Sequence, residues 1–316
     1  MSEIRFDGRV AVVTGAGRGL GRAYAHLLGA RGASVVVNDI GGSTEGEGLD
    51  AGPAQSVVDE IVAAGGTAVA DTHDVSTPEG AKAIIDTAVT TYGRIDVLVN
   101  NAGIMKWGGL PDIDADNVQR HFDVHLLGSF NTMLAAWPHF VEQGYGRVVL
   151  TTSTGFFGLD NNLSYAVAKG GTIGLARSAK LSGAPHNIKV NLIAPAAQTR
   201  LAGGDAGEDN PPREDGQIWM PSSAVAPMVA YLAHEDVPVS GETYVAGAGR
   251  FSRLFVASTQ GYVEPEGLPT VEDVAAHWDE INDEKEYYVP DDLMAWSGAF
   301  LAHQLRAIPD HIGPES

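Results

Sequence analysis

The stretch that decides the fold lies near the N-terminus and reads Arg9-Val10-Ala11-Val12-Val13-Thr14, followed at once by Gly15-Ala16-Gly17-Arg18-Gly19-Leu20-Gly21. The first six residues are mostly apolar and β-branched, which is typical of a short buried strand. The glycines permit a tight turn and a close approach of backbone to a pyrophosphate, whose charge the N-terminus of the next helix stabilises. This order predicts a nucleotide-binding unit whose contacts include Gly15, Arg18, Gly19, Leu20 and Gly21.

A second apolar run, residues 34–38, ends at Asp39, where a dinucleotide-binding fold carries the acid that accepts hydrogen bonds from the adenosine ribose. Such an acid repels a 2′-phosphate, and residues 38–50 contain no Lys or Arg to neutralise one. The sequence therefore predicts NAD rather than NADP as cofactor. Two observations keep the alternative open: Arg18 lies in the glycine turn within reach of a 2′-phosphate, and Asp is also common in strand-end turns.

Strands and helices alternate along the next part of the chain. Helices are predicted at 54–64 and 78–92, and strands near Ala68 and at 95–99. This alternation predicts an α/β fold, a doubly wound parallel sheet of the Rossmann type with its ligand at the carboxyl ends of the strands. Two groups stand at such ends, Asp74-Val75 and Asn101-Ala102-Gly103, and we expect them to contact the cofactor. For Asp74, a bond to adenine and an ordinary turn role are both open.

The glycine-rich stretch 41–48 follows Asp39 directly. Its composition of Gly, Ser, Thr and Glu predicts a mobile surface loop.

A candidate catalytic pair lies about midway along the chain, in Ser164-Tyr165-Ala166-Val167-Ala168-Lys169. On a helix, Tyr165 and Lys169 share one face. A buried ammonium beside the phenol would lower the pKa of Tyr165 from about 10 towards working pH and create a general base. The alternative is a packed Tyr beside a solvated Lys. The predicted strand 147–153 ends in hydroxyl residues that can face the Tyr across a site.

Composition excludes several classes of function. Forty acidic residues against twenty Lys and Arg give a formal net charge of -20, which disfavours binding to nucleic acid and to anionic membranes. The absence of cysteine excludes disulfides, Cys-ligated metals and thiol nucleophiles. No apolar run approaches the roughly 20 residues that span a bilayer, and we expect a cytoplasmic protein.

Two patterns resemble metal sites without completing one. His121 and His125 are four apart on a predicted helix but lack a third ligand. Asp112, Asp114 and Asp116 alternate as in a calcium loop, yet the glycine and the terminal glutamate of such a loop are missing. These acids are better suited to cap and charge the first turn of the helix. We expect no metal.

The chain is expected to form one domain over residues 1–250 and an extension over 251–316. Between 196 and 223 the composition changes to Gly, Asp, Glu and Pro, which predicts a substrate lid or, alternatively, a surface insertion. The extension contains too many aromatic residues for a disordered tail. Thr270 and Asp273 resemble a capping box there. We expect a helical extension that docks on the domain or on a neighbouring subunit.

Taken together and in order, the motifs resemble the short-chain dehydrogenase/reductase family over residues 5–250. They are Thr14-Gly15-(x3)-Gly19-x-Gly21, Asn100-Asn101-Ala102-Gly103, Ser153 and Tyr165-x3-Lys169. Further stretches, among them Val36-Val37-Asn38-Asp39 and Val245-x-Gly247-Ala248-Gly249, are similar to one branch of that family. This branch is the (3R)-hydroxyacyl-CoA dehydrogenase unit of peroxisomal multifunctional enzymes, also described as a 17β-hydroxysteroid dehydrogenase, and the similarity continues through the tail.

The resemblance implies the roles of the site residues. Tyr165 removes the substrate hydroxyl proton, Ser153 bonds the substrate oxygen, and Lys169 holds the nicotinamide ribose. His125 stands where most of the wider family has an Asn whose backbone carbonyl holds a relay water. Thr152 occupies the family's usual spacing before the Tyr and remains the alternative to Ser153. The expected cofactor contacts also include Tyr165, Lys169, Pro195 and Thr199.

The implied function is the NAD-dependent oxidation of a 3-hydroxyacyl-CoA to the 3-oxoacyl-CoA, in fatty-acid or steroid side-chain β-oxidation. The alternatives are a 17β-hydroxysteroid or other secondary-alcohol dehydrogenase, and a catalytically idle NAD-binding sensor or scaffold. A CoA site needs cations near its mouth, for which the candidates are Lys106, Arg200, Arg250 and Arg253. Small residues in the predicted helix 164–181 permit close approach of another helix, and we expect a homodimer or homotetramer.

Overall fold

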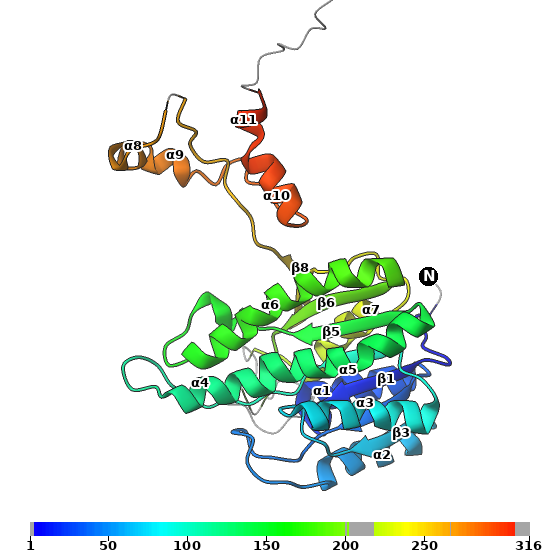
Figure 1. Cartoon of the computed structure of the whole chain (residues 1–316). Coiled ribbons are helices and arrows are strands. Elements are labelled where there is room, and N and C mark those ends of the chain that lie inside the picture. The colour runs from blue at the N-terminus through cyan, green and yellow to red at the C-terminus, as the bar shows by residue number, and fades with distance from the viewer. Residues whose placement is uncertain (1–2, 200, 202–217, 266, 307–316) are drawn as a thin grey trace, which may run out of the picture. The chain divides into compact units, whose positions relative to one another are not determined.

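The computed structural model describes residues 3–199, 201, 218–265 and 267–306 (Figure 1). The chain divides into two compact units, Met1–Leu254 and Phe255–Ser316. The predicted lid, 196–223, falls largely on residues 202–217, which lie outside the described residues, as does Arg200.

The first unit is built on an eight-stranded sheet with the order β3-β2-β1-β4-β5-β6-β7-β8. Strands β1 to β7 are parallel to their neighbours, and β8 pairs antiparallel with β7. The prediction of a doubly wound parallel sheet is therefore confirmed. The strands are β1 (Val10–Thr14), β2 (Ser34–Asn38), β3 (Thr67–Asp71), β4 (Val97–Asn100), β5 (Gly146–Thr151), β6 (Ile188–Pro195), β7 (Thr243–Gly247) and β8 (Arg250–Leu254).

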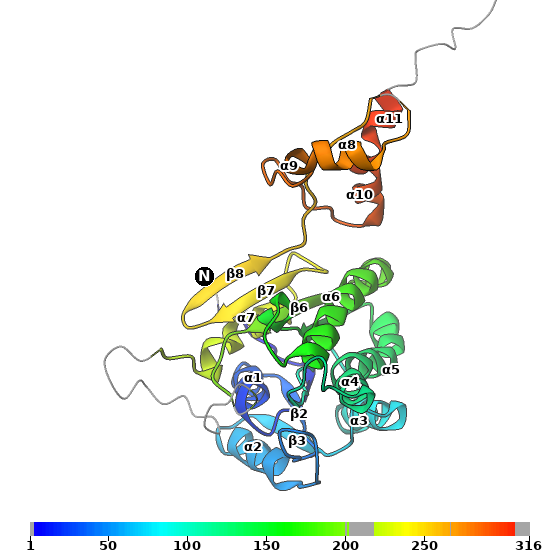
Figure 2. The ribbon, with the colours of Figure 1, turned by 90° about the vertical axis from the view of Figure 1, so that its left-hand side faces the viewer.

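Helices cover both faces of the sheet (Figures 1 and 2). In the first unit they are α1 (Gly19–Ala30), α2 (Gly52–Ala63), α3 (Pro78–Tyr92), α4 (Ala115–His121), the π-helical η1 (Phe122–Leu127), α5 (Gly128–Gln143), α6 (Leu163–Gly183) and α7 (Ala226–Leu232). Short 3₁₀ turns are η2 (Thr154–Phe157), η3 (Ala184–His186) and η5 (Ser222–Ala224). None of the helices in the described residues is both long and apolar enough to cross a bilayer.

Alternation along the strands divides the core into two layers. Val13, Val35 and Val99 point to the face that α1, α2 and α7 cover. Their sequence neighbours, such as Val12 and Leu98, point to the opposite face, against α3, α5 and α6. Because both faces are covered, the central strands are apolar throughout, which is the pattern that the sequence shows at residues 10–13 and 35–37.

Local signals set the helix boundaries. Pro78 occupies the first turn of α3, the Thr77 hydroxyl accepts a bond from Gly80 N–H, and Gly93 ends the helix with a φ of 80°. Asp114 caps α4 by accepting a bond from Asn117 N–H, which confirms the capping role predicted for it.

The order of the strands places a crevice at the site. β1 lies between β2 and β4, so successive connections leave it in opposite directions. The register pairs Thr14 with Asn38, which brings Gly15 and Asp39 to the same edge of the sheet. The glycine turn and the strand-end polar residues therefore face one crevice.

The second unit contains α8 (Val271–Ala276), α9 (Trp278–Ile281), α10 (Leu293–Phe300) and α11 (Ala302–Arg306). The predicted capping box is present, because the side chains of Thr270 and Asp273 each bond the other's backbone N–H. His277 lies between α8 and α9, and its ring stacks on that of Tyr262 with a centroid separation of 3.7 Å.

Candidate active site

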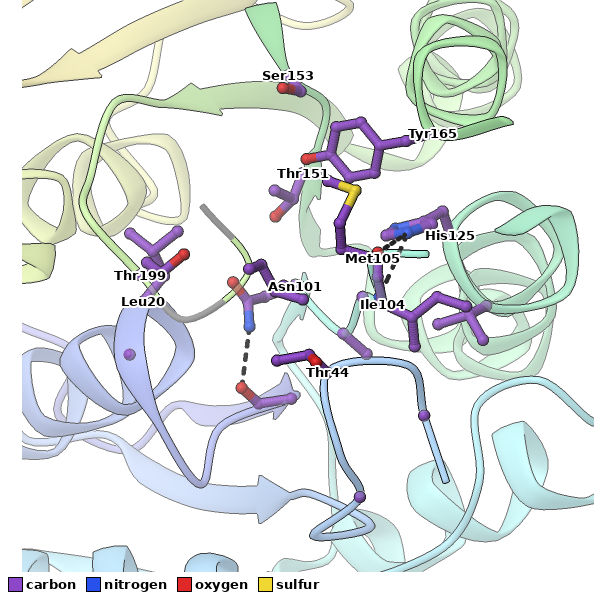
Figure 3. Close-up of a pocket in the computed structure, with 18 of the residues that line it drawn as sticks. Leu20, Thr44, Asn101, Ile104, Met105, His125, Thr151, Ser153, Tyr165 and Thr199 are labelled. Carbon is purple, nitrogen blue, oxygen red and sulfur yellow. Dashed lines mark hydrogen bonds between the residues drawn. The ribbon is translucent and has the colours of Figure 1, made fainter. Parts of the chain in front are cut away.

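The carboxyl edge of the sheet borders a cavity of about 460 Å³, a volume in the range of small-molecule and cofactor sites (Figure 3). It contains almost all of the residues predicted from the sequence. The predicted residues that line it are Gly15, Arg18, Gly19, Leu20, Asp39, Asp74, Val75, Asn101, Ala102, Gly103, His125, Ser153, Tyr165, Lys169, Pro195 and Thr199. Residues from six strand ends and from helix α6 thus converge on one site.

The glycine turn fits a dinucleotide pyrophosphate. A Cβ on Gly15 would lie 2.8 Å from the Cα of Ala102, so only glycine permits this close crossing of β1 and β4. At Gly19, with a φ of 51°, a Cβ would meet nothing closer than 3.8 Å, which leaves the start of α1 open to the cavity. The side chain of Arg18, the N-cap residue of α1, makes no capping hydrogen bond. The free N–H groups of this helix N-terminus and the helix dipole suit a phosphate.

Gly21 is the exception among the predicted cofactor residues, because it does not line the cavity. It lies beneath the turn, where a Cβ would be 2.2 Å from the carbonyl oxygen of Gly15 and 2.6 Å from Nδ2 of Asn101. The direct cofactor contact expected at Gly21 stays a prediction, and the cavity lining gives it no support. The glycine is required for the packing of α1 against the turn.

Asn101 holds the same turn from the other side. Its Nδ2 donates to the carbonyl oxygens of Thr14 and Gly15, both at 3.0 Å, as Figure 3 shows for one of these bonds. The backbone N–H groups of Asn101 and Ala102 donate to the Thr14 hydroxyl at 3.0 and 3.1 Å. Asn101 thereby fixes the ends of β1 and β4 to each other.

Asp39 is tied into the cavity wall by its carboxylate, which accepts bonds from the N–H groups of Gly17 at 2.8 Å and Gly41 at 2.7 Å. Arg18 lines the same cavity, and its Nη1 donates to the carbonyl of Gly42 at 3.4 Å. The acid that favours NAD and the cation that would favour NADP thus share one wall. The choice between the cofactors stays a prediction.

Asp74 has the turn role that the sequence left open for it, and the bond to adenine stays a prediction. Its Oδ1 accepts a bond from the Ser76 N–H at 2.8 Å, as a turn residue does, while the residue also lines the cavity.

The two candidate hydroxyls after β5 point in different directions. Ser153 lines the cavity next to Tyr165, whereas the Thr152 hydroxyl is fully buried and donates to the backbone carbonyl of Lys169 at 2.8 Å. Figure 3 shows Ser153 and Thr151 on the side of the cavity that the Tyr165 hydroxyl faces. The geometry favours Ser153 as the group that can bond a substrate oxygen.

Burial dominates the electrostatics of the Tyr165 and Lys169 pair. The Lys169 ammonium, 3% exposed, donates to the Thr151 carbonyl at 2.7 Å and lies 5.7 Å from the centroid of the Tyr165 ring. Desolvation lowers the pKa of Lys169 to about 7. Burial also raises the pKa of Tyr165, and the Ser153 hydroxyl opposes this by favouring the phenolate. The sequence predicted a lowered pKa for Tyr165, and this is wrong, because burial of the phenol raises the pKa.

His125 lies against the phenol ring from the other side. The two rings meet edge to face, with centroids 5.2 Å apart and an interplanar angle of 89°. The imidazole Nε2 is 2.9 Å from the Ile104 carbonyl oxygen and 3.3 Å from the Ile104 backbone nitrogen, so the ring is held at the backbone of Ile104. Burial holds the pKa of His125 well below its ordinary value, which keeps the ring neutral. Its own backbone carbonyl accepts a bond from the Ser129 hydroxyl at 2.7 Å.

The stretch 41–48 was expected to be a mobile surface loop, and the structure instead docks its tip on the far wall of the cavity. Thr44 accepts a hydrogen bond from Met105 N–H at 2.8 Å, and Gly42, Ser43, Thr44 and Gly46 line the cavity. Sequence reasoning missed these contacts because they join residues some sixty positions apart. The sequence did contain one indication of these contacts. The stretch directly follows a strand that ends at the edge of the sheet where ligands bind.

Two exposed apolar side chains also line the cavity, and a cation lies in the sequence next to one of them. Trp107 and Leu159 line the cavity, and their side chains are 53% and 62% exposed. Trp107 also borders a second cavity of about 350 Å³, together with Lys106. Among the described candidates for a CoA contact, only Lys106 lies at either cavity. Arg253 is ion-paired with Glu242 at 2.7 Å, away from both.

His121 and His125 stack with centroids 5.7 Å apart, as their spacing allows. In the part of the chain that the structure describes, no cluster of three His, Asp or Glu side chains is arranged to hold a metal ion.

Comparison with known proteins adds to this geometry. Residues 9–203 match the short chain dehydrogenase family. A short-chain type dehydrogenase/reductase of Mycobacterium tuberculosis is 44% identical over 278 residues, which cover 87% of this chain and 94% of that protein. The peroxisomal multifunctional enzyme type 2 of Drosophila melanogaster is 42% identical over 289 residues, which cover 89% of this chain and 46% of that enzyme.

Solved structures show the same relationship. The full-length Drosophila multifunctional enzyme superposes with a TM-score of 0.78 at 34% identity, covering 96% of this chain and 50% of that one. This chain thus spans about half the length of the multifunctional relative. A 7α-hydroxysteroid dehydrogenase in complex with NADH and 7-oxo glycochenodeoxycholic acid superposes with a TM-score of 0.67 at 29% identity, covering 78% of this chain and 95% of that one.

Proposed function

Because this chain belongs to the short-chain dehydrogenase family, a family of oxidoreductases acting on CH–OH groups, we propose that it oxidises a 3-hydroxyacyl-CoA to the 3-oxoacyl-CoA with NAD+. The observation that carries the proposal is the convergence of Ser153, Tyr165 and Lys169 on the cavity that the glycine turn and Asp39 also line. One cavity would thus contain the proton acceptor, the hydroxyl that binds the substrate oxygen and the dinucleotide site.

In the proposed reaction the Tyr165 phenolate accepts the proton of the substrate hydroxyl. The Ser153 hydroxyl donates a hydrogen bond to the substrate oxygen as it becomes a carbonyl, and it also favours the phenolate. When bound, NAD+ would supply the redox chemistry as the acceptor of the hydride that the hydroxyl carbon loses. Lys169 would hold the nicotinamide ribose, with its ammonium fixed at the Thr151 carbonyl.

The residues that would hold the cofactor are the turn from Gly15 to Leu20 and the wall at Asp39, with Asp74 and Val75 beyond. Asp39 supports NAD, because its carboxylate would repel a 2′-phosphate and residues 38–50 contain no cation. The opposing residue, Arg18, already bonds the carbonyl of Gly42.

For the substrate, an acyl-CoA is supported by the multifunctional relatives and by the cavity mouth. Trp107 and Leu159 offer apolar contacts for an acyl chain, and Lys106 next to Trp107 offers a cation for a CoA phosphate. The second candidate is a hydroxysteroid dehydrogenase. The same apolar side chains would contact a steroid, and the structural relative with a bound bile-acid derivative favours this reading.

The experiment that tests the proposal measures NADH formation with (R)- and (S)-3-hydroxyacyl-CoAs of several lengths beside a 17β-hydroxysteroid, and repeats each reaction with NADP+. We expect turnover of one acyl-CoA enantiomer with NAD+, and a Michaelis constant that rises with salt because the CoA phosphates need a cation. Turnover of the steroid alone would establish the second candidate. Tight NADH binding without turnover of any substrate would indicate an idle sensor or scaffold.

We further propose a cytoplasmic homodimer or homotetramer. Leu127, Phe130 and Leu134 recur on one side of η1 and α5 and are 40%, 41% and 59% exposed, a pattern that suits burial against another subunit. The cytoplasmic location rests on the sequence alone. Sedimentation equilibrium measures the subunit number, and a monomer at micromolar concentration would contradict the assembly.

A further inference from the structure

Residues 41–48, here called the bridge segment, form a loop that is closed at its base and bonded within itself. Gly41 N–H donates to the Asp39 carboxylate at 2.7 Å, and Asp50 N–H donates to the Ile40 carbonyl at 2.9 Å. Inside the segment, Ser43 N–H donates to the Glu47 carbonyl at 2.8 Å. The segment therefore has a defined conformation that begins directly at the predicted ribose-binding acid.

The tip of the bridge segment is bonded to the opposite wall of the cavity. The guanidinium of Arg120, at the end of α4, donates from Nε to the Glu45 carbonyl at 3.0 Å and from Nη2 to the Gly46 carbonyl at 2.7 Å. The Met105 N–H donates to the Thr44 carbonyl at 2.8 Å. Figure 3 shows Thr44 beside Ile104 and Met105 at the tip of this loop.

Gly46 permits the tip to approach Ile104 and Arg120 this closely, and a residue with a side chain would not fit here. Its φ is 80°, and a Cβ there would lie 2.8 Å from Cγ2 of Ile104 and 3.2 Å from Nη2 of Arg120. The close approach of the tip to the far wall therefore depends both on the missing side chain at Gly46 and on the two hydrogen bonds from the Arg120 guanidinium.

The cavity contains residues from both sides of this contact. Asp39 and Gly42 belong to the wall where the bridge segment starts, and Ile104 and Met105 belong to the wall where it ends. A ligand that reaches from Asp39 to Tyr165 lies in the cavity that Gly42, Ser43, Thr44 and Gly46 of the segment also line. Three hydrogen bonds hold the tip, two of them from Arg120, which is exposed. Each such bond contributes only about 1 kcal/mol net at a surface, so loss of the guanidinium removes much of what holds the tip.

We propose that Arg120 is a positioning residue that holds the bridge segment across the cavity and thereby retains the nicotinamide cofactor. The proposal rests on the cofactor site of the proposed function. Arg120 acts through the backbone of Glu45 and Gly46, so the side chain at position 45 is immaterial. Removal of the guanidinium opens the tip, and the cofactor then dissociates faster while the Tyr165 chemistry is unchanged.

The test compares wild type with Arg120→Ala and Arg120→Lys, and uses Lys82→Ala as a control. Lys82 is an exposed cation on α3 that pairs with Asp86 and does not line the cavity. Amide hydrogen exchange of residues 41–48 is measured in the ligand-free proteins. Stopped-flow fluorescence gives the dissociation rate of NADH, or of NADPH if the wild type binds that cofactor more tightly.

In Arg120→Ala we expect faster exchange across 43–47 and a rise of about tenfold in the cofactor dissociation rate and Kd, as for the loss of two charge-assisted hydrogen bonds at a surface. The KM for the cofactor rises in parallel, the KM for the hydroxyl substrate is unchanged, and kcat does not fall. We expect smaller changes in hydrogen exchange and cofactor dissociation in Arg120→Lys, because lysine keeps the positive charge but lacks the two donors of the guanidinium. Lys82→Ala is expected to behave as wild type.

Two results would overturn the inference while the proposed function stands. One is hydrogen exchange that does not respond to Arg120→Ala, since Arg120 would then not hold the segment. The other is faster exchange with an unchanged cofactor dissociation rate. A wild-type protein that binds neither NADH nor NADPH would instead overturn the proposed function, and the retention of a cofactor with it.

Discussion

The hydroxyl of Thr152 donates a hydrogen bond to the backbone carbonyl of Lys169, with 2.8 Å between the two oxygens. The same carbonyl accepts a bond from the Thr172 hydroxyl at 2.7 Å. Thr152 therefore belongs to the packing of α6 on the end of β5. Ser153, one residue later in the chain, points to the cavity instead.

This relationship predicts different consequences for the two neighbouring hydroxyls. Ser153→Ala is expected to lower kcat/KM by about a hundredfold, because an oxygen-binding donor is lost. Thr152→Val is expected to keep kcat near wild type and to cost about 1 kcal/mol of unfolding free energy, since Thr172 still satisfies the Lys169 carbonyl. Steady-state kinetics and urea unfolding measure both. If instead Thr152→Val lost kcat/KM and Ser153→Ala kept it, Thr152 would be the catalytic hydroxyl.

Tyr165 gives a prediction for the pH dependence of the rate. Burial raises its pKa and the Ser153 hydroxyl lowers it, so removal of that hydroxyl leaves the phenolate less favoured. We expect kcat/KM to rise with pH in wild type and the rising limb to move to higher pH in Ser153→Ala. Tyr165→Phe should lower kcat by about 10²-fold to 10⁴-fold while NADH still binds. Near-wild-type turnover in that variant would refute the role of Tyr165.

Lys169 gives a prediction for stability. Its pKa is about 7 in the folded protein against an ordinary value of 10.5, so the unfolded chain binds the proton more tightly. Between these two values a falling pH therefore destabilises the ligand-free fold, and below about pH 7 the penalty is constant. At about 1.4 kcal/mol per pKa unit, this penalty is on the order of 5 kcal/mol.

Lys169→Met removes the ammonium and keeps most of the volume of the side chain. We expect the variant to gain unfolding free energy relative to wild type at pH 6, and to gain less or nothing at pH 9. Denaturant unfolding at the two pH values measures this difference. An equal gain in unfolding free energy at pH 6 and pH 9 would show that the buried ammonium of Lys169 has no desolvation penalty.

Asp39 and Arg18 give a prediction for cofactor choice. Asp39→Asn removes the charge that repels a 2′-phosphate and retains an acceptor for one of the two glycine N–H groups. The ratio of kcat/KM for NAD+ over NADP+ is expected to fall by about tenfold or more, and a second change, Arg18→Ala, should reverse the gain with NADP+. Glu47→Gln, which removes a charge outside the cavity, serves as the control. An unchanged ratio in Asp39→Asn would assign the selectivity elsewhere.

The sequence by itself determined the alternation of strands and helices along the chain, the glycine turn and the shared helix face of Tyr165 and Lys169. These features follow from short-range rules, namely the period of apolar residues, the conformational freedom of glycine and the pitch of the helix. Almost every residue predicted for the site therefore lines one cavity. Gly21 does not line the cavity. The spacing of the motif shows that a glycine is needed at this position, but it does not show whether a ligand or the protein chain occupies the space beside it.

Only the tertiary structure decided the direction of the hydroxyls, the sign of the pKa shift at Tyr165 and the docking of residues 41–48. Whether Thr152 or Ser153 faces the cavity depends on a carbonyl of α6, and the pKa of Tyr165 depends on how completely the fold removes water from it. The bridge segment meets Arg120 across the cavity although the two are far apart in sequence. Such contacts arise from the superposition of distant segments, which local residue patterns do not encode.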